Sequence, residues 1–144
     1  IDDSPEATLA LRFAARRAAR TGGGVMVLAI VPPQDFVAFG GVQATIEAEA
    51  REHAEELVAA AADAIAQEAN VTPQIMVKSG KPAEIVRDVI GANDEIAALV
   101  LATAASGAPG PLVAHFTGHD AGTLPCPVML VPGAIDLARL DALS

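Results

Sequence analysis

The run Val25-Met26-Val27-Leu28-Ala29-Ile30-Val31 is apolar throughout and rich in β-branched residues. Its length and composition are typical of a strand buried on both faces, as in parallel sheets. Pro32-Pro33 ends the run, and Gly22-Gly23-Gly24 precedes it. The triple glycine follows a predicted helix and leads into a strand. Phosphate-binding loops have the reverse order, so we interpret these glycines as a helix stop.

Strands and helices alternate along the rest of the chain. The sequence predicts further strands and helices as follows: strands at 72–77, 96–103 and 128–131; helices at Pro5–Arg20 (capped by Ser4), 44–69, Ala83–Ile90 and Leu112–Thr117; and one helical turn within 135–143. Buried strands alternating with amphipathic helices predict an α/β fold, with a parallel sheet covered by helices on both faces. A first strand is expected to end at Ile1 and to be largely missing from this sequence, because the acidic turn Asp2-Asp3-Ser4 is of the kind that follows a strand.

The composition excludes several classes of protein. The chain has 144 residues, of which 52% are hydrophobic and 3% aromatic. We therefore expect a single domain over residues 1–144 with a core of Ala, Val, Leu and Ile. This apolar fraction is too high for a disordered chain. The formal net charge of −9 argues against nucleic-acid binding, because the protein and the phosphate backbone repel each other.

Cysteine content and hydropathy further limit the kinds of site and segment that the chain can contain. Cys126 is the single cysteine, so the sequence predicts no intrachain disulfide and no zinc site of several thiolates. The apolar run Ile96–Ala105 has about half of the ~20 residues that a membrane-spanning helix needs. No signal peptide is visible. We expect a soluble cytoplasmic protein that binds no membrane.

Two groups of residues leave alternatives open. Arg12, Arg16 and Arg20 recur every four residues and form a stripe on the first helix, which is either an anion site or a solvated face. Phe36 and Phe39 lie in the loop at 34–44 and either mark a contact surface or pack under the next helix.

Four motifs occur in an order that resembles the universal stress protein family. Asp2-Asp3-Ser4 followed by Ala10-Leu11 is similar to the family's opening pattern, and Val77–Ile85 is similar to its V-x-x-G-x-P-A-x-x-I segment. Leu99–Thr103 stands where the family has a strand leading to a glycine loop, and Pro125–Val131 is similar to its closing P-C-P-V-x-x-V strand. The resemblance covers nearly the whole chain. It implies a five-stranded parallel sheet of Rossmann-like type, a homodimer and a cytoplasmic role in the stress response.

Some members of this family bind ATP, with Mg²⁺ as a further cofactor candidate. Those members carry G-x2-G-x9-G-S/T after the fourth strand, where glycines let backbone N–H groups approach the phosphates. Here Gly107 and Gly110 give the first spacing, but seven residues separate Gly110 from Gly118, and His119 replaces the hydroxyl residue. Thr103 also stands where the family often has glycine.

The resemblance therefore implies an altered nucleotide crevice. Asp2 matches a family aspartate near the nucleotide, and Ile30 matches an apolar position beside the adenine; a turn residue and a core residue are the alternatives. Pro109 and Pro111 remove two backbone donors, and the segment from Gly118 to Pro125 is shorter than the family's helix. The candidate crevice residues are Asp2, Ile30, Thr103, Gly107, Gly110, Gly118 and His119.

Catalytic constellations are weak, and we expect no enzyme. His115 and His119 have the i,i+4 spacing of a metal-binding pair and Asp120 follows, but Gly118 intervenes on the helix, so we expect no metal site. Elsewhere, Ser106 lacks a G-x-S-x-G context, Cys126 is expected to be buried, and His53 is expected to be a partly exposed helix residue.

Three functional hypotheses follow. The leading one is a regulatory or interaction module of the stress response, with a degenerate nucleotide loop, no catalytic activity and a protein partner. The alternative is an ATP-binding stress protein or slow ATPase, and the third is a sensor of a small molecule in the same crevice. Backbone donors converging on a cavity near Gly107, Gly110 and Gly118 would favour the alternative, whereas a proline-stiffened backbone packed across it would favour the leading hypothesis.

Overall fold

The computed structural model describes residues 1–33 and 40–144, with side chains from residue 44 onward in the second range. The expectations for Phe36 and Phe39 lie outside the described residues. Within these ranges the elements alternate in the order α1 (Ala7–Thr21), β1 (Met26–Val31), α2 (Gly40–Ala69), β2 (Gln74–Ser79), α3 (Pro82–Ala92), β3 (Leu99–Thr103), α4 (Pro111–Thr117), β4 (Val128–Pro132) and α5 (Leu137–Leu143).

Every strand and helix predicted after Ser4 is present, and several boundaries differ. α2 begins four residues earlier than predicted, at Gly40, and β2 is shifted by two residues toward the C-terminus. β3 begins at Leu99 rather than at residue 96, because Ile96 N–H closes a turn on the Asn93 carbonyl (3.1 Å). The prediction that Ser4 caps α1 was wrong, since its side chain donates to Asp2 and the helix begins after Glu6 without a side-chain cap.

The strands form two separate parallel pairs rather than the single five-stranded sheet expected. β1 pairs with β2, and β3 pairs with β4. The amine of Ile1 donates to the Leu28 carbonyl (2.7 Å), so the described chain starts beside β1.

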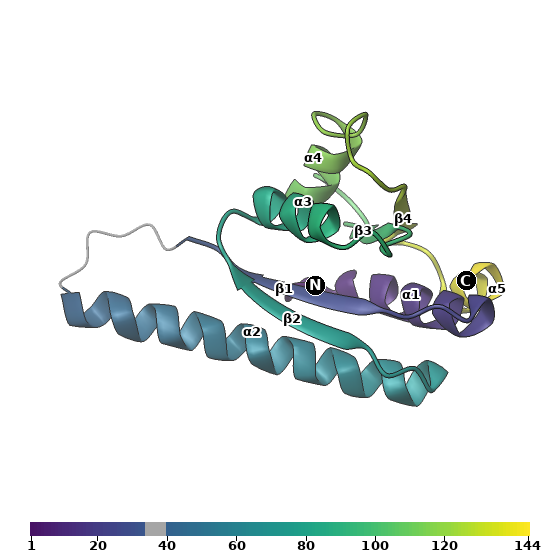
Figure 1. Cartoon of the computed structure of the whole chain (residues 1–144). Helices are drawn as coiled ribbons and strands as arrows, with labels where there is room; N and C mark the ends of the chain where they lie inside the picture. The colour runs from purple at the N-terminus through teal and green to yellow at the C-terminus, as the bar shows by residue number, and fades with distance from the viewer. Residues whose placement is uncertain (34–39) are drawn as a thin grey trace.

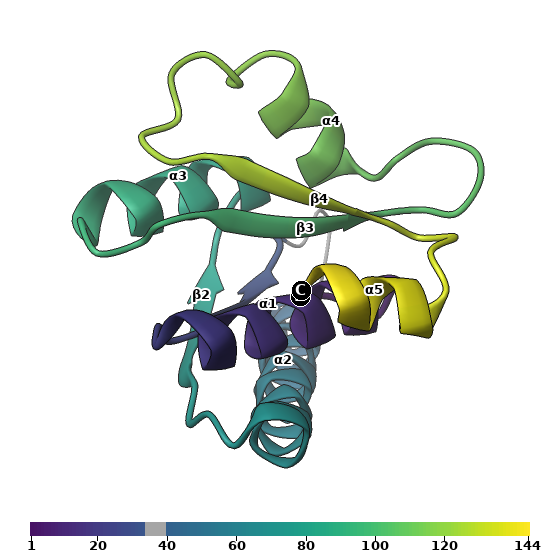
Figure 2. The same ribbon diagram turned by 90° about the vertical axis from the view of Figure 1, so that its right-hand side faces the viewer.

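Helices cover the strand pairs from two sides. Figure 1 shows α2 along one side of β1 and β2, with α3 and α4 on the other. Figure 2 shows α4 above β3 and β4, α1 and α5 below them, and α3 alongside. Both views match the expected layers of an α/β fold.

β1 takes part in both hydrophobic cores, as its continuous apolar sequence predicts. Val27, Ala29 and Val31 are buried among α1 and α2 residues. Leu28 and Ile30 point to the other face and pack against the cluster that contains Phe116. Because successive side chains of a strand point to opposite faces, an apolar run is needed to fill both cores.

A glycine closes the carboxyl end of β3. A Cβ added to Gly133, just after β4, would lie 2.2 Å from the Thr103 carbonyl oxygen and 2.7 Å from the Ala105 nitrogen. Both are backbone atoms, so neither can move away as a side chain would. The turn after β4 therefore packs directly on the chain that leaves β3.

Replacing Gly133 with Ala should destabilise the protein by about 1–3 kcal/mol, because the added methyl overpacks a backbone contact. The measurement is urea unfolding followed by circular dichroism. Gly91→Ala is the matched control, since Gly91 lies exposed in α3 with nothing within 4 Å of an added Cβ. That control should gain about 0.5–1 kcal/mol from helix propensity. Equal stability of Gly133→Ala and the wild type would contradict the packing described.

Candidate functional site

The acidic turn before α1 uses both of its aspartates internally. Asp2 Oδ1 accepts the N–H of Ser4 (2.9 Å) and also the Ser4 hydroxyl. Asp3 Oδ2 accepts a hydrogen bond from His53 Nε2 on α2 (2.6 Å). Asp2 thus fits its alternative interpretation as a turn residue. His53 is exposed on its helix as expected, but its partner lies 50 residues away and was not foreseen.

The loop after β3 closes on itself. The N–H of Ala104 donates to the Pro109 carbonyl (3.2 Å), and the N–H of Gly133 donates to the Thr103 hydroxyl (3.4 Å). Pro109 and Pro111 have no N–H to offer. The Ala104 N–H and the Thr103 hydroxyl oxygen are therefore engaged within the protein.

Gly107 and Gly110 are required by backbone conformation. Their φ angles are +77° and +111°, values that side-chain-bearing residues rarely adopt. A Cβ at either position would meet nothing within 4 Å. Their glycine identity is therefore explained by the loop's shape and needs no closely approaching group.

The structure separates the two halves of the predicted phosphate cradle. Gly110 precedes the first residue of α4, and Gly118 follows its last residue. At 1.5 Å per residue, the eight residue steps from Gly110 to Gly118 correspond to about 12 Å along the helix axis. His119 follows Gly118 and lies exposed at that far end.

Ile30 belongs to a core. Its side chain is half-buried and packs with Leu28 against the cluster of Val86, Ile90 and Phe116. Of the seven predicted crevice residues, the structure brings Thr103, Gly107 and Gly110 into one loop, and it places Gly118 and His119 beyond α4.

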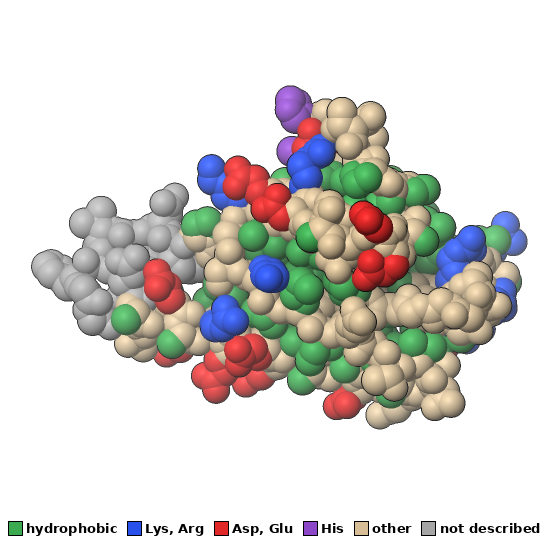
Figure 3. All heavy atoms as spheres, viewed as in Figure 1, with side chains coloured by type: hydrophobic (Ala, Val, Ile, Leu, Met, Phe, Trp, Pro, Cys, Tyr) green, Lys and Arg blue, Asp and Glu red, His purple; other side chains and the backbone are tan. Residues whose placement is uncertain are grey.

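A polar cluster missed by the sequence analysis joins α3 to the turn after α4. Asp120 Oδ2 accepts from His115 Nε2 (2.6 Å) and forms an ion pair with Arg87 Nη2 (3.1 Å), which also donates to the Thr123 hydroxyl (2.8 Å). The hydrogen bonds from His115 and then Arg87 lower the pKa of Asp120. Figure 3 shows histidine, basic and acidic side chains gathered at this end of the molecule. These contacts hold the turn after α4.

Two further kinds of side chain are those that could bind a metal ion and those that could act as nucleophiles. Within residues 1–33 and 40–144, no three His, Cys, Asp or Glu side chains form a group that could hold a metal ion. Cys126 is half-buried, and burial raises the pKa of its thiol, which lowers the fraction of nucleophilic thiolate. None of the helices in the described part of the chain is long and apolar enough to cross a membrane.

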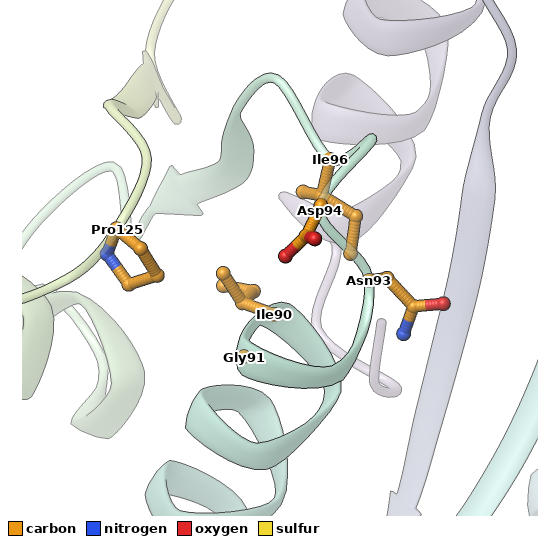
Figure 4. A pocket seen from close by; sticks show the side chains of 6 residues that line it. All are labelled: Ile90, Gly91, Asn93, Asp94, Ile96 and Pro125. Atoms are coloured by element: carbon orange, nitrogen blue, oxygen red, sulfur yellow. The ribbon is translucent and has the colours of Figure 1, made fainter.

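Two cavities lie away from the predicted crevice. One, of about 190 Å³, lies beside the end of α3; Figure 4 shows the Asp94 carboxylate directed toward Ile90 while the Asn93 amide points away. The other is an open groove of about 580 Å³ between α2 and the ends of β1 and β2, with Arg51 and Ser79 in its walls. Only the groove falls within the volume range typical of ligand sites.

The arginine stripe of α1 is neither a free anion site nor a solvated face. Arg12 makes two hydrogen bonds to the Asp141 carboxylate of α5 (2.7 Å each) and a third to Glu68 of α2 (2.7 Å). Arg16 pairs with the other oxygen of Glu68 (2.8 Å), and Arg20 reaches the Asp141 carbonyl (3.3 Å). We call this cluster the arginine clamp. It joins three helices, and no local sequence signal connects Arg12 with a residue 129 positions away.

Comparisons with known proteins agree with this architecture of parallel strands between helices. The model of the Universal stress protein family matches residues 1–132. The chain therefore belongs to the universal stress protein family. A solved structure, universal stress protein UspA from Lactobacillus plantarum, superposes with a TM-score of 0.74 at 20% identity, covering 91% of this chain and 92% of that chain. A search of the curated proteins found no match.

The arginine clamp should stabilise the protein in a pH-dependent manner. Its hydrogen bonds from Arg12 lower the pKa of Asp141 below the ordinary 3.8. The contribution is therefore present above pH 3.8 and lost as the pH falls through the lowered value. Asp141→Asn should reduce the melting temperature at pH 7, and the difference from the wild type should shrink as the pH approaches 3. Asp63→Asn, at an exposed α2 carboxylate outside the clamp, is the control and should match the wild type throughout. A pH-independent loss would contradict this account.

Proposed function

We propose that this protein is a non-catalytic regulatory or interaction module of the stress response, whose nucleotide loop no longer binds ATP. The carrying observation is the separation of Gly110 from Gly118 by the whole of α4. A phosphate cradle needs N–H donors that converge on one point, and donors at opposite ends of a helix do not.

The internal contacts of the loop support the same proposal. Ala104 N–H and the Thr103 hydroxyl already have partners within the protein, and two prolines replace donors. For the Ala104 N–H to donate to a phosphate, its bond to the Pro109 carbonyl would first have to break. Membership of the family supports a role in the stress response, and a single free cysteine suits a reducing cytoplasm.

Native mass spectrometry with and without ATP and Mg²⁺ tests this proposal. We expect no saturable uptake of ATP up to millimolar concentration, and no phosphate release in a parallel hydrolysis assay. Uptake at micromolar ATP would overturn the proposal.

The Asp2→Ala variant shows which crevice is used if uptake occurs. Loss of ATP in this variant, with unchanged circular dichroism, would establish the alternative function, an ATP-binding stress protein that uses the family's crevice. Unchanged uptake would place the nucleotide elsewhere.

We also infer that the two strand pairs belong to one five-stranded sheet and that the protein forms a homodimer. The Ile1 amine already bonds to β1 where a neighbouring strand would lie, and β1 and β3 share a core. Exposed large apolar side chains concentrate near the C-terminal end, at Leu130 (42% exposed), Leu137 (53%) and Leu143 (51%). These residues supply apolar area for a second copy.

Light scattering at micromolar concentration should give twice the chain mass for the wild type. Leu130→Lys should give a monomer, because a charge is then buried at the contact. Ile75→Lys is the matched control, since Ile75 is similarly exposed (53%) on the opposite strand pair and should leave the dimer intact. A monomeric wild type would remove the dimer.

A further inference from the structure

The first turns of α2 extend past the sheet that the rest of the helix covers. The buried residues of α2 begin at Ala54 and continue with Val58, Ala61 and Ile65. Residues 44–53 are exposed or at most half-buried. Figure 1 shows this end of α2 reaching beyond the ends of β1 and β2. We call residues 44–53 the α2 arm.

The open groove lies on the inner side of the α2 arm. Ala48 and Arg51 of the arm form one wall, and Val31 and Ser79, the last residues of β1 and β2, form the other. The width of the groove therefore depends on where the arm sits relative to the strand ends.

Two side chains fix the base of the arm on opposite sides. Arg51 Nη1 donates to the Ser79 hydroxyl at the end of β2 (3.4 Å), and Arg51 Nε pairs with Glu55 (3.4 Å). His53 Nε2 donates to Asp3 in the turn before α1 (2.6 Å). Arg51 keeps its charge across the physiological pH range, whereas His53 does not.

We propose that the His53–Asp3 contact is a proton-controlled latch that seats the α2 arm and sets the opening of the groove. When His53 is protonated, it is paired with the Asp3 carboxylate across the two elements. When it loses the proton, the ion pair is lost and only a weaker, uncharged hydrogen bond to Asp3 remains.

The charges around His53 place this transition above pH 6.5. The hydrogen bond to Asp3, followed by the charge of Asp3, raises the pKa of His53 above its ordinary 6.5, and Glu56 on the same helix adds to the rise. A raised histidine pKa stabilises the latched form fully below pH 6.5 and ceases to do so as the pH rises through the raised value. Asp3 and Glu56 are the charged groups that face His53 from the turn and from its own helix.

Histidine NMR titration of the full chain tests the proton part. The wild-type His53 should titrate above 6.5, and Asp3→Asn should bring it down toward 6.5. An identical titration of His53 in both proteins would overturn the latch. The signals of His115 and His119 serve as internal references that Asp3→Asn should leave unchanged.

Hydrogen exchange tests the movement of the arm. Protection factors of amides 45–53, corrected for intrinsic rates, should be about twofold to fivefold higher at pH 6 than at pH 8 in the wild type. In Asp3→Asn this pH dependence should vanish. Arg51→Gln is the matched control, because it weakens the other anchor and should lower protection equally at both pH values. Wild-type protection that is the same at pH 6 and pH 8 would overturn the proposal.

Discussion

Strand β1 is the constraint on which both hydrophobic cores depend. Its odd-numbered residues complete the core under α1 and α2, and its even-numbered residues Leu28 and Ile30 reach the core under α3 and α4. The strand pair β3–β4 joins the rest of the molecule partly through the second core, to which Leu99, Leu101 and Val128 also belong. A polar residue at any position from Val27 to Val31 would therefore pack in one core or the other, at a cost in stability unless it found a hydrogen-bond partner there.

The carboxyl ends of the strands are closed by internal contacts. The Ala104 N–H and the Thr103 hydroxyl oxygen bond within the protein, and Pro109 and Pro111 have no N–H to donate. Gly133 packs on the chain leaving β3, and Arg87, His115 and Asp120 hold the turn after α4. The proposal of a non-catalytic interaction module rests on these contacts.

The sequence was sufficient to predict local features of the chain, but not the contacts between residues that lie far apart in it. Apolar periodicity predicted every strand and helix, and Gly22, with φ of +71°, ends α1 as its sequence context indicated. Ser4 was wrongly predicted to cap α1, because a serine before a helix is as typical of a turn as of a helix cap. Only the geometry shows that its hydroxyl donates to Asp2. The arginine stripe was visible, but its partners Glu68 and Asp141 lie on other helices. The Asp3–His53 contact was hidden for the same reason, since periodicity carries no information about which surfaces meet.

The polar contacts between helices have a particular importance in this composition. With 3% aromatic residues, the helices meet through small side chains such as Ala15, Ala54 and Ala61, which are nearly fully buried. Alanine allows two helices to approach closely, but its small side chain does little to fix the position of one helix along the other. The directional hydrogen bonds of Arg12 and Arg16 fix this position for α1. The Asp3–His53 and Arg51–Ser79 contacts do the same where α2 leaves the sheet. The core thus provides the adhesion, and a few charged contacts at its rim fix the positions of the helices.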